Sequence, residues 1–364
     1  MIKRWLRRMI VHVDQYLFIA VAGLMLVGLA VLFSASDMSP ARVGGQALNM
    51  LLALSVMWGA ANVPPHYLMR LALPLYVLGV LLLVAVALFG EVANGARRWL
   101  NLGVARIQPS ELMKIAMPLM LAWYLDRYEA ILSMKNFAIA TLLLVIPVAL
   151  IARQPDLGTA LLISAAGFYV LFLAGLNWRI IVGLAVAAGA AMPVLWSMMH
   201  DYQKRRILTL LDPSSDPLGA GYHTIQATIA VGSGGFIGKG WLNGTQAHLD
   251  FLPERTTDFI FAVFSEEFGF VGNLVLLLLF LAVIGRGMLI TAGASTLFTR
   301  LLAGAITLTF FTYAFVNMGM VSGILPVVGV PLPLISYGGT ALVTICLGMG
   351  MLMSIQTNKK LVRT

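Results

Sequence analysis

Charged residues are scarce in this chain of 364 residues: only 11% are Asp, Glu, Lys or Arg, whereas 60% are hydrophobic. Soluble domains carry about 25% charged residues, so a soluble fold is excluded. Cys346 is the only cysteine, which excludes an internal disulfide and a cysteine-based metal cluster. The five histidines are scattered and form no HExxH or paired-His motif, so a tightly held zinc ion is not expected.

In place of charge the chain has a series of apolar runs, each close to the about 20 residues that a membrane-spanning helix needs. Backbone groups in lipid must be hydrogen-bonded internally, so these runs are expected to be helices rather than strands. We predict an all-α polytopic membrane protein, with 1–364 as a single domain and about ten transmembrane helices. The predicted spans are roughly 16–35, 43–62, 67–89, 110–126, 137–152, 158–174, 179–199, 258–284, 301–324 and 336–355.

The basic residues are distributed unequally between the two sides of the predicted bundle. With a cytoplasmic N-terminus, that face carries thirteen basic and three acidic residues, against eleven basic and twelve acidic on the other. This asymmetry follows the positive-inside rule and predicts that both termini are cytoplasmic. The first apolar run exceeds the about 7–15 residues of a signal-peptide core, so it is expected to stay as the first helix. The outer basic residues indicate either lipid-headgroup contact or an anionic, phosphorylated substrate.

The longest connection is an outer loop at approximately 200–257, between the seventh and eighth spans. Its centre is apolar and rich in glycine, which predicts short helices and turns at the bilayer interface. The glycines are expected to permit close backbone approach to a ligand or headgroup. The run GSGGFIGKG is not a phosphate-binding P-loop, because it lacks the first glycine of that motif and the Ser or Thr after the lysine.

A second irregular segment, 323–339, contains three prolines between the last two predicted spans. Apolar backbone that is not helical is tolerated at membrane depth only where it is buried in protein or lines a cavity. We therefore expect this segment to fold back and form a wall of the functional site. An ordinary proline-rich turn is the alternative.

Acidic residues are informative because there are only fifteen, and three of them fall within 250–258 together with Arg255. Asp258 is the last charge before an apolar span. An ionisable group at the edge of a low-dielectric region is a candidate functional residue. The alternative is a solvated loop end that caps a helix.

Other charged residues lie inside or beside the predicted spans. Glu111 and Lys114 open the fourth span at i,i+3 spacing, which places both side chains on one helix face. They form either a structural ion pair or part of a substrate site. Asp156 is most simply the N-cap of the sixth span. One of the adjacent Glu266 and Glu267 must face the bundle interior.

Four long blocks carry a resemblance to a known family: GARRWLNLGVARIQPSELMKI, RQPDLGTA, GKGWLNGTQAHLDFLPERTTDFIFAVFSEEFG and VNMGMVSGILPVVGVPLPLISYGGTAL. Over essentially the whole chain the sequence resembles the SEDS family (shape, elongation, division and sporulation proteins), polytopic polymerases of bacterial peptidoglycan. The form GKGWLNGTQ followed by FLPERTTDFIFAV is more similar to the elongation member than to the division member. Thr256 departs from the pattern, since relatives often carry His there. That position is therefore not expected to carry a proton in the reaction, whereas Asp258 is retained.

The resemblance implies glycosyl transfer on lipid II at the outer leaflet of the bacterial inner membrane, without a nucleotide. The growing glycan on undecaprenyl pyrophosphate is the donor, and the 4-hydroxyl of a lipid II GlcNAc attacks it to form a β-1,4 bond. Asp258 is expected to be the catalytic base, since a carboxylate can accept the proton of the attacking hydroxyl. Arg106, Lys114 and Arg153 are expected to hold the pyrophosphate. The remaining predicted substrate-binding residues are Glu111, Asp156, Lys239, Glu254 and Arg255.

No tightly bound cofactor is expected, although a divalent cation, Mg²⁺ or Mn²⁺, is an alternative way to stabilise the leaving pyrophosphate. The resemblance implies a single-pass class B penicillin-binding transpeptidase and the elongation machinery as partners, and no nucleic acid. The ninth span is expected to contact the transpeptidase through Gly304 or Phe311, and packing of its glycines within the bundle is the alternative. Two other functions stay open: a lipid II flippase, which needs a polar route to the inner leaflet, and a scaffold without activity.

Overall fold

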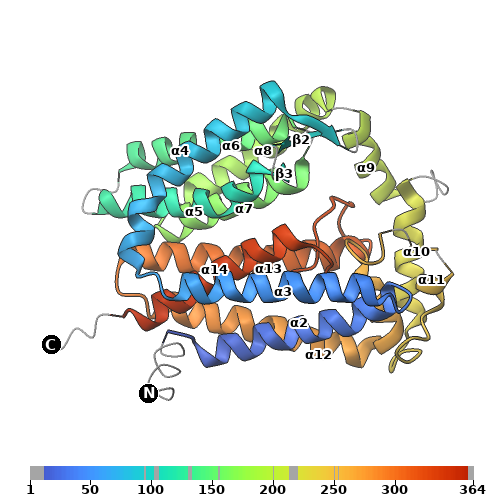
Figure 1. The fold of residues 1–364 in the computed structure, drawn as a ribbon. Coiled ribbons are helices and arrows are strands. Elements are labelled where there is room, and N and C mark those ends of the chain that lie inside the picture. The colour runs from blue at the N-terminus through green and yellow to red at the C-terminus, as the bar shows by residue number, and fades with distance from the viewer. Residues whose placement is uncertain are drawn as a thin grey trace, which may run out of the picture.

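The computed structural model describes residues 12–93, 96–101, 106–129, 133–154, 156–199, 201–212, 220–249, 251–252 and 254–359. In this part of the chain ten helices of 17 residues or more form a bundle (Figure 1). They are α2 (Gln15–Ala35), α3 (Pro40–Ala61), α4 (Pro65–Phe89), α5 (Pro109–Arg127), α6 (Met134–Ala152), α7 (Leu157–Leu173), α8 (Trp178–Met198), α12 (Ile260–Ala292), α13 (Leu297–Val321) and α14 (Gly339–Thr357).

These helices coincide one for one with the ten predicted spans, so the predicted all-α polytopic fold is confirmed. Seven of the described helices are long and apolar enough to cross a membrane by themselves, and α7 and α8 contain shorter apolar stretches. Helix α5 carries Glu111, Lys114, Asp126 and Arg127 within 19 residues, and much of it is buried in the bundle. Charged residues are tolerated there because the surrounding helices shield them from lipid. The chain is a multi-pass membrane protein.

Helix α12 departs from the predicted eighth span in both its bounds and its shape. Its 33 residues would be about 50 Å long at 1.5 Å per residue, well beyond the about 30 Å of a bilayer core. Gly269 interrupts it with φ 62 and ψ −159. The kink separates a short first part, 260–268, which we call the arm helix, from the long part that follows. The long part of α12, after Gly269, therefore begins later and ends later than the span predicted at 258–284.

Helix α13 is the central helix, and most of its residues are buried inside the protein. It packs against α12, α7 and α5. A Cβ added to Gly304 would lie 2.2 Å from Leu173 Cδ1 of α7 and 3.2 Å from Thr291 Cγ2 of α12. Gly304 therefore serves packing within the bundle, and its expected role in partner contact is wrong. Phe311, on the same helix, is 41% exposed on the outside of the bundle.

The two longest connecting segments lie at one end of the bundle, opposite the end where α2 begins and α14 finishes (Figure 1). The long loop forms α9 (Asp201–Leu211), α10 (Ala220–Ser233) and α11 (Thr245–His248), as its composition predicted. The shorter loop before α5 forms an antiparallel sheet of β1 (Glu91–Ala93), β2 (Ala96–Asn101) and β3 (Arg106–Ile107) in the order β1-β2-β3. We refer to this end of the molecule as the loop end.

The glycines of the long loop contact the protein itself. A Cβ on Gly234 would lie 2.1 Å from the carbonyl oxygen of Ser265, and one on Gly238 would lie 2.1 Å from that of Glu267. The loop backbone donates from Lys239 N to Glu266 O at 3.0 Å. Only glycine allows two backbones to approach so closely. The expectation that these glycines admit a ligand or headgroup is wrong at both positions, because the arm helix occupies the space.

Candidate active site

Asp258 lies at the loop end, in the turn that leads into the arm helix, and its backbone is held from outside that turn. Its carbonyl oxygen accepts a hydrogen bond from Asn317 Nδ2 of α13 at 2.9 Å. Asn317 is completely buried and also donates to the carbonyl oxygen of Val330 at 2.7 Å. One amide group thus joins the central helix to both the Asp258 turn and the segment before α14. Asn317 is 59 positions from Asp258 and 13 positions from Val330 in the sequence.

The irregular segment 322–338 folds back onto the Asp258 turn, as the sequence predicted. Ser336 Oγ donates to the carbonyl oxygen of Thr257 at 2.6 Å, and Tyr337 N donates to that of Thr256 at 2.9 Å. Gly329 of this segment lies beside the aspartate, since a Cβ placed on it would lie 3.4 Å from Asp258 Oδ2. At this contact the segment presents a residue without a side chain to the carboxylate.

A polar cavity of about 180 Å³ begins at Gly329 and extends between α5 and α7. It brings together residues from β2, α5, α7, the 322–338 segment and α14, which are separated by more than 200 positions in the sequence. A polar hollow inside a mostly apolar bundle fits a substrate with a charged or sugar headgroup better than it fits a lipid chain. Its lining residues are Arg98, Gln108, Glu111, Lys114, Asp156, Gly158, Thr159, Leu162, Gly329, Val330, Pro331 and Ala341.

Glu111 and Lys114 form an ion pair in the cavity wall. Their oxygen and nitrogen are 2.5 Å apart, and their side chains are 16% and 7% exposed. Thr344 of α14 donates to the second oxygen of Glu111 at 3.2 Å, and the Lys114 ammonium lies 5.5 Å from the centre of the Tyr313 ring. The i,i+3 spacing produced the expected pair. The structural ion pair is therefore confirmed; both residues also line the cavity, and their contact with substrate stays a prediction.

Asp156 caps helix α7, as predicted, and accepts a hydrogen bond from Thr159 N at 3.2 Å. Its other oxygen accepts from Gln108 Nε2 at 3.2 Å, across the cavity from the start of α5. The cap therefore also joins α5 to α7 at the mouth of the cavity. Gln108 was not among the predicted site residues, although its place directly before Pro109 at the start of a charged helix was a signal.

The other predicted substrate-binding residues lie outside the cavity lining. Arg153 is exposed beyond the end of α6, and Glu254 is exposed with φ 49. Lys239 pairs with Glu266 at 2.6 Å, and Arg255 pairs with Asp37 of the loop after α2. Their contact with substrate stays a prediction. Arg106 lies in β3, but its side chain, like residue Asp250, is outside the described part of the chain.

Arg98, which was not among the predicted site residues, supplies a cation to the cavity. It belongs to β2, the central strand of the small sheet, and this strand contacts α5. Among the described residues no group of three or more His, Cys, Asp or Glu side chains is arranged to hold a metal ion. The site thus combines two cations with three carboxylates: Asp258 at the rim, and Glu111 and Asp156 in the cavity lining.

The fold and this site define a class: a multi-pass helical membrane protein with a charged cavity at its loop end. A family profile described as Cell cycle protein, which groups FtsW, RodA and SpoVE, matches residues 14–361. The chain belongs to this family.

Among its relatives is the peptidoglycan glycosyltransferase MrdB of Escherichia coli, 50% identical over 352 residues, which are 96% of this chain and 95% of that protein. A probable peptidoglycan glycosyltransferase FtsW of Geobacter metallireducens is 35% identical over 95% of each chain.

Two solved structures are similar over nearly the whole fold. One, described as the structural coordination of polymerization and crosslinking by a peptidoglycan synthase complex, has a TM-score of 0.82 and 34% identity, covering 94% of this chain and 97% of that chain. The other is the rod shape determining protein RodA of Thermus thermophilus, with a TM-score of 0.71 and 29% identity, covering 94% and 96%.

Proposed function

We propose that this chain is a peptidoglycan glycosyltransferase that polymerises lipid II into β-1,4 glycan strands for cell elongation. It acts at the outer leaflet of the bacterial inner membrane, with both termini in the cytoplasm and the loop end in the periplasm. The charge asymmetry of the sequence supports this orientation. The observation that carries the proposal is the polar cavity with the Asp258 carboxylate against Gly329 at its rim.

The reaction needs few catalytic groups. The attacking 4-hydroxyl of lipid II must lose a proton as it displaces pyrophosphate from the anomeric carbon of the growing strand, with inversion. Asp258 is a carboxylate whose backbone is fixed by Asn317, so it is suited to accept that proton as a general base. Pyrophosphate leaves readily, so no second carboxylic acid is required to protonate it.

The leaving pyrophosphate needs positive charge near its oxygens. Lys114 and Arg98 line the cavity and can supply it, Lys114 as a point charge and Arg98 as a bidentate donor. Glu111 keeps Lys114 in place and offsets the cost of burying it until the substrate arrives. Arg106 and Arg153, at the same end of the chain's fold, complete the predicted set of cations for the pyrophosphate.

A divalent cation, if one takes part, is a better fit as part of the substrate than as a resident cofactor. Mg²⁺ is typically bound through one or two carboxylates together with substrate phosphates. Here Glu111 and Asp156 are the carboxylates in the cavity lining, and both already accept hydrogen bonds within the protein. A cation bound here would rely mainly on the pyrophosphate oxygens and would stabilise their developing charge.

The partner that we propose is a class B penicillin-binding transpeptidase, which cross-links the strands that this chain makes and links it to the elongation machinery. The likeness to a peptidoglycan synthase complex supports this assignment. With Gly304 buried, the exposed face of α13 around Phe311 and Phe315 is the part of the ninth span left for a transmembrane helix of the partner.

The experiment that tests the function is polymerisation of purified lipid II by the purified protein in detergent, read as glycan chain length on a gel. Polymer is expected from this chain with its transpeptidase partner, including when the partner's transpeptidase serine is blocked. Reconstitution into vesicles with lipid II on one side separates the alternatives. Translocation without polymer would indicate a flippase, and neither activity would indicate a scaffold.

A further inference from the structure

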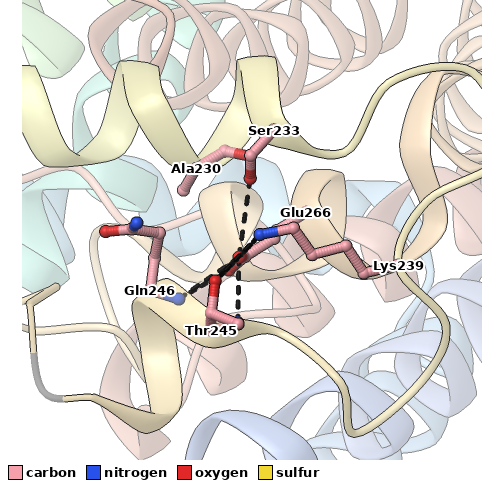
Figure 2. A network of polar contacts seen from close by, with 6 residues as sticks. All are labelled: Ala230, Ser233, Lys239, Thr245, Gln246 and Glu266. Carbon is pink, nitrogen blue, oxygen red and sulfur yellow. Dashed lines mark hydrogen bonds and ion pairs between the residues drawn. The ribbon is translucent and has the colours of Figure 1, made fainter.

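The carboxylate of Glu266 is completely buried and holds the long loop from several directions (Figure 2). Its Oε1 accepts hydrogen bonds from Lys239 Nζ at 2.6 Å, from Thr245 N at 2.9 Å and from Thr245 Oγ1 at 2.9 Å. Gln246 N donates to both oxygens at 3.2 Å, and Ser233 Oγ of α10 lies 3.5 Å away. A buried charge is costly unless it is paired and hydrogen-bonded, and here both conditions are met.

Glu266 takes no direct part in the proposed chemistry. It is absent from the lining of the polar cavity, and its donors belong to the last residue of α10 and to the loop between α10 and α12. Two of those donors are backbone N–H groups, which hold their position more firmly than a long side chain does. The carboxylate therefore fixes the course of the loop backbone relative to the arm helix.

The loop is also fastened to α2, so the arm helix has an anchor outside its own segment. Trp241 Nε1 donates to the carbonyl oxygen of Ala30 at 3.0 Å, and the Trp241 ring lies 5.9 Å from that of Phe33. Ser34 Oγ, on the same helix, donates to the neighbouring Glu267. The clamp formed by Glu266 thus connects the end of the arm helix to the rest of the bundle.

The arm helix links this clamp to the aspartate. The arm helix begins at Ile260, six positions before Glu266, which at 1.5 Å per residue is about 9 Å, and Asp258 lies two residues further in the preceding turn. The Asp258 end is held by Asn317 and by the 322–338 segment, and the other end is held by Glu266 and its loop. A tilt of about 10° at the clamped end would move the aspartate by about 2 Å on this length scale.

We propose that Glu266 is a positioning residue for the glycosyltransferase reaction: by clamping the loop at 239–246 it sets the direction of the arm helix and so the place of the Asp258 carboxylate. The inference rests on the proposed function, in which Asp258 is the base. A displacement of about 1 Å in a reacting group can cost about 100-fold in rate. Substrate binding in the cavity does not involve Glu266, so its loss affects turnover rather than affinity.

The test compares Glu266→Leu and Glu266→Gln in lipid II polymerisation by the complete protein with its transpeptidase partner. Glu266→Leu keeps the volume but removes every acceptor, and kcat is expected to fall about 10–100-fold with KM for lipid II unchanged. Glu266→Gln keeps one acceptor oxygen for the loop N–H groups, so kcat is expected to stay within about fivefold of wild type. A role limited to stability would lower the amount of active protein in both variants without this rescue.

Hydrogen exchange supplies a second readout that does not depend on turnover. Backbone amides in 254–259 should exchange faster in Glu266→Leu, although these residues lie outside the arm helix and precede the substituted residue in the sequence. Asp14→Asn, which removes the buried carboxylate that caps the first turn of α2, is the control and should leave that exchange unchanged. If Glu266→Leu does not fold, the same exchange measured in Thr245→Val, which removes one donor to Glu266, decides the question, and Glu266→Gln is then the variant expected to match wild type.

The outcomes separate this inference from the function on which it rests. If Asp258→Asn is inactive in the same assay while Glu266→Leu keeps the wild-type kcat, the positioning role is overturned and the function stands. Unchanged exchange at 254–259 in every folded variant overturns it as well. If Asp258→Asn polymerises lipid II as well as wild type, the proposed function fails first.

Discussion

The Asp258 carboxylate lies against Gly329, with 3.4 Å between Oδ2 and the position that a Cβ of Gly329 would occupy. Gly329 has φ +72, a conformation that residues with a side chain rarely adopt. The same glycine lines the polar cavity. The contact therefore connects the proposed base to the proposed substrate site, across 71 positions of sequence, through backbone alone.

We expect Gly329→Ala to lower polymerisation more than its effect on stability explains. Gly323→Ala is a matched control, because Gly323 has the same φ of +72 in the same segment and faces Thr228 and Thr224 instead. Both substitutions carry a similar backbone cost of about 1–2 kcal/mol. Only the added methyl group at Gly329 approaches the aspartate. Equal losses of activity in the two variants, at equal thermal stability, would show that the contact between Gly329 and Asp258 does not affect the reaction.

Variants of the Glu111–Lys114 pair are expected to separate effects on stability from effects on activity. Removing one partner of a buried pair leaves an unpaired charge and costs roughly 3–5 kcal/mol. Lys114→Met and Glu111→Gln are therefore each expected to lower the melting temperature in detergent. The double variant Glu111→Gln, Lys114→Met removes both charges and should regain much of that stability while polymerising no lipid II. Activity in the stable double variant would remove Lys114 from pyrophosphate binding.

The close approach of the glycine-rich loop to the arm helix predicts that alanine substitutions at Gly232 and Gly238 have unequal effects on stability and activity. A Cβ at Gly238 would lie 2.1 Å from the carbonyl oxygen of Glu267, and Gly238 has φ +80, whereas a Cβ at Gly232 meets nothing within 4 Å. Gly238→Ala should lower both the melting temperature and polymerisation. Gly232→Ala, within helix α10, should leave both within error or raise stability slightly. Similar behaviour of the two variants would contradict the packing described for this loop.

Asp14, at the opposite end of the bundle, predicts a pH dependence of stability. Burial alone would raise the pKa of Asp14, but hydrogen bonds from Arg286 and from Leu17 N outweigh it and lower the pKa below its ordinary 3.8. A carboxylate with a lowered pKa in the folded state stabilises the protein above the unfolded value and loses that contribution as pH falls through the folded value.

The expected result is that Asp14→Asn melts at a lower temperature than wild type by a constant amount between about pH 5 and 8. The difference should narrow only below about pH 4, as wild-type Asp14 becomes protonated. Melting curves in one detergent at a series of pH values measure it. A difference that already disappears between pH 5 and 7 would contradict the assigned pKa direction.

The helices could be predicted from the sequence because apolar length alone decides them in a membrane. Each predicted span became a helix, and the charged start of α5 gave the Glu111–Lys114 pair from its spacing. The bounds of α12 could not be predicted, because Gly269 breaks the helix through contact with a loop rather than through its own sequence. A Cβ on Gly269 would lie 2.3 Å from Gly238 N.

The candidate site could be predicted in part, because charged residues are rare in an apolar sequence and are therefore easy to recognise. Asp258, Glu111, Lys114 and Asp156 stood out as charges at the edges of apolar runs, and all four lie at or beside the cavity. Lys239 stood out by composition too, but its nearest partner is Glu266, a contact that depends on how the long loop folds back. Pairing across long sequence separations leaves no periodic signal.

The central claim is that Asp258 is the base that activates lipid II, and the rate of Asp258→Asn tests it most directly. The variant keeps the size of the side chain and the backbone contact with Asn317, so it should fold and bind lipid II as wild type does. Loss of a general base costs about 10²–10⁴ in rate. The account predicts a fall of that size in single-turnover polymerisation at saturating lipid II, with an unchanged melting temperature. A folded Asp258→Asn that polymerises lipid II at the wild-type rate would contradict it.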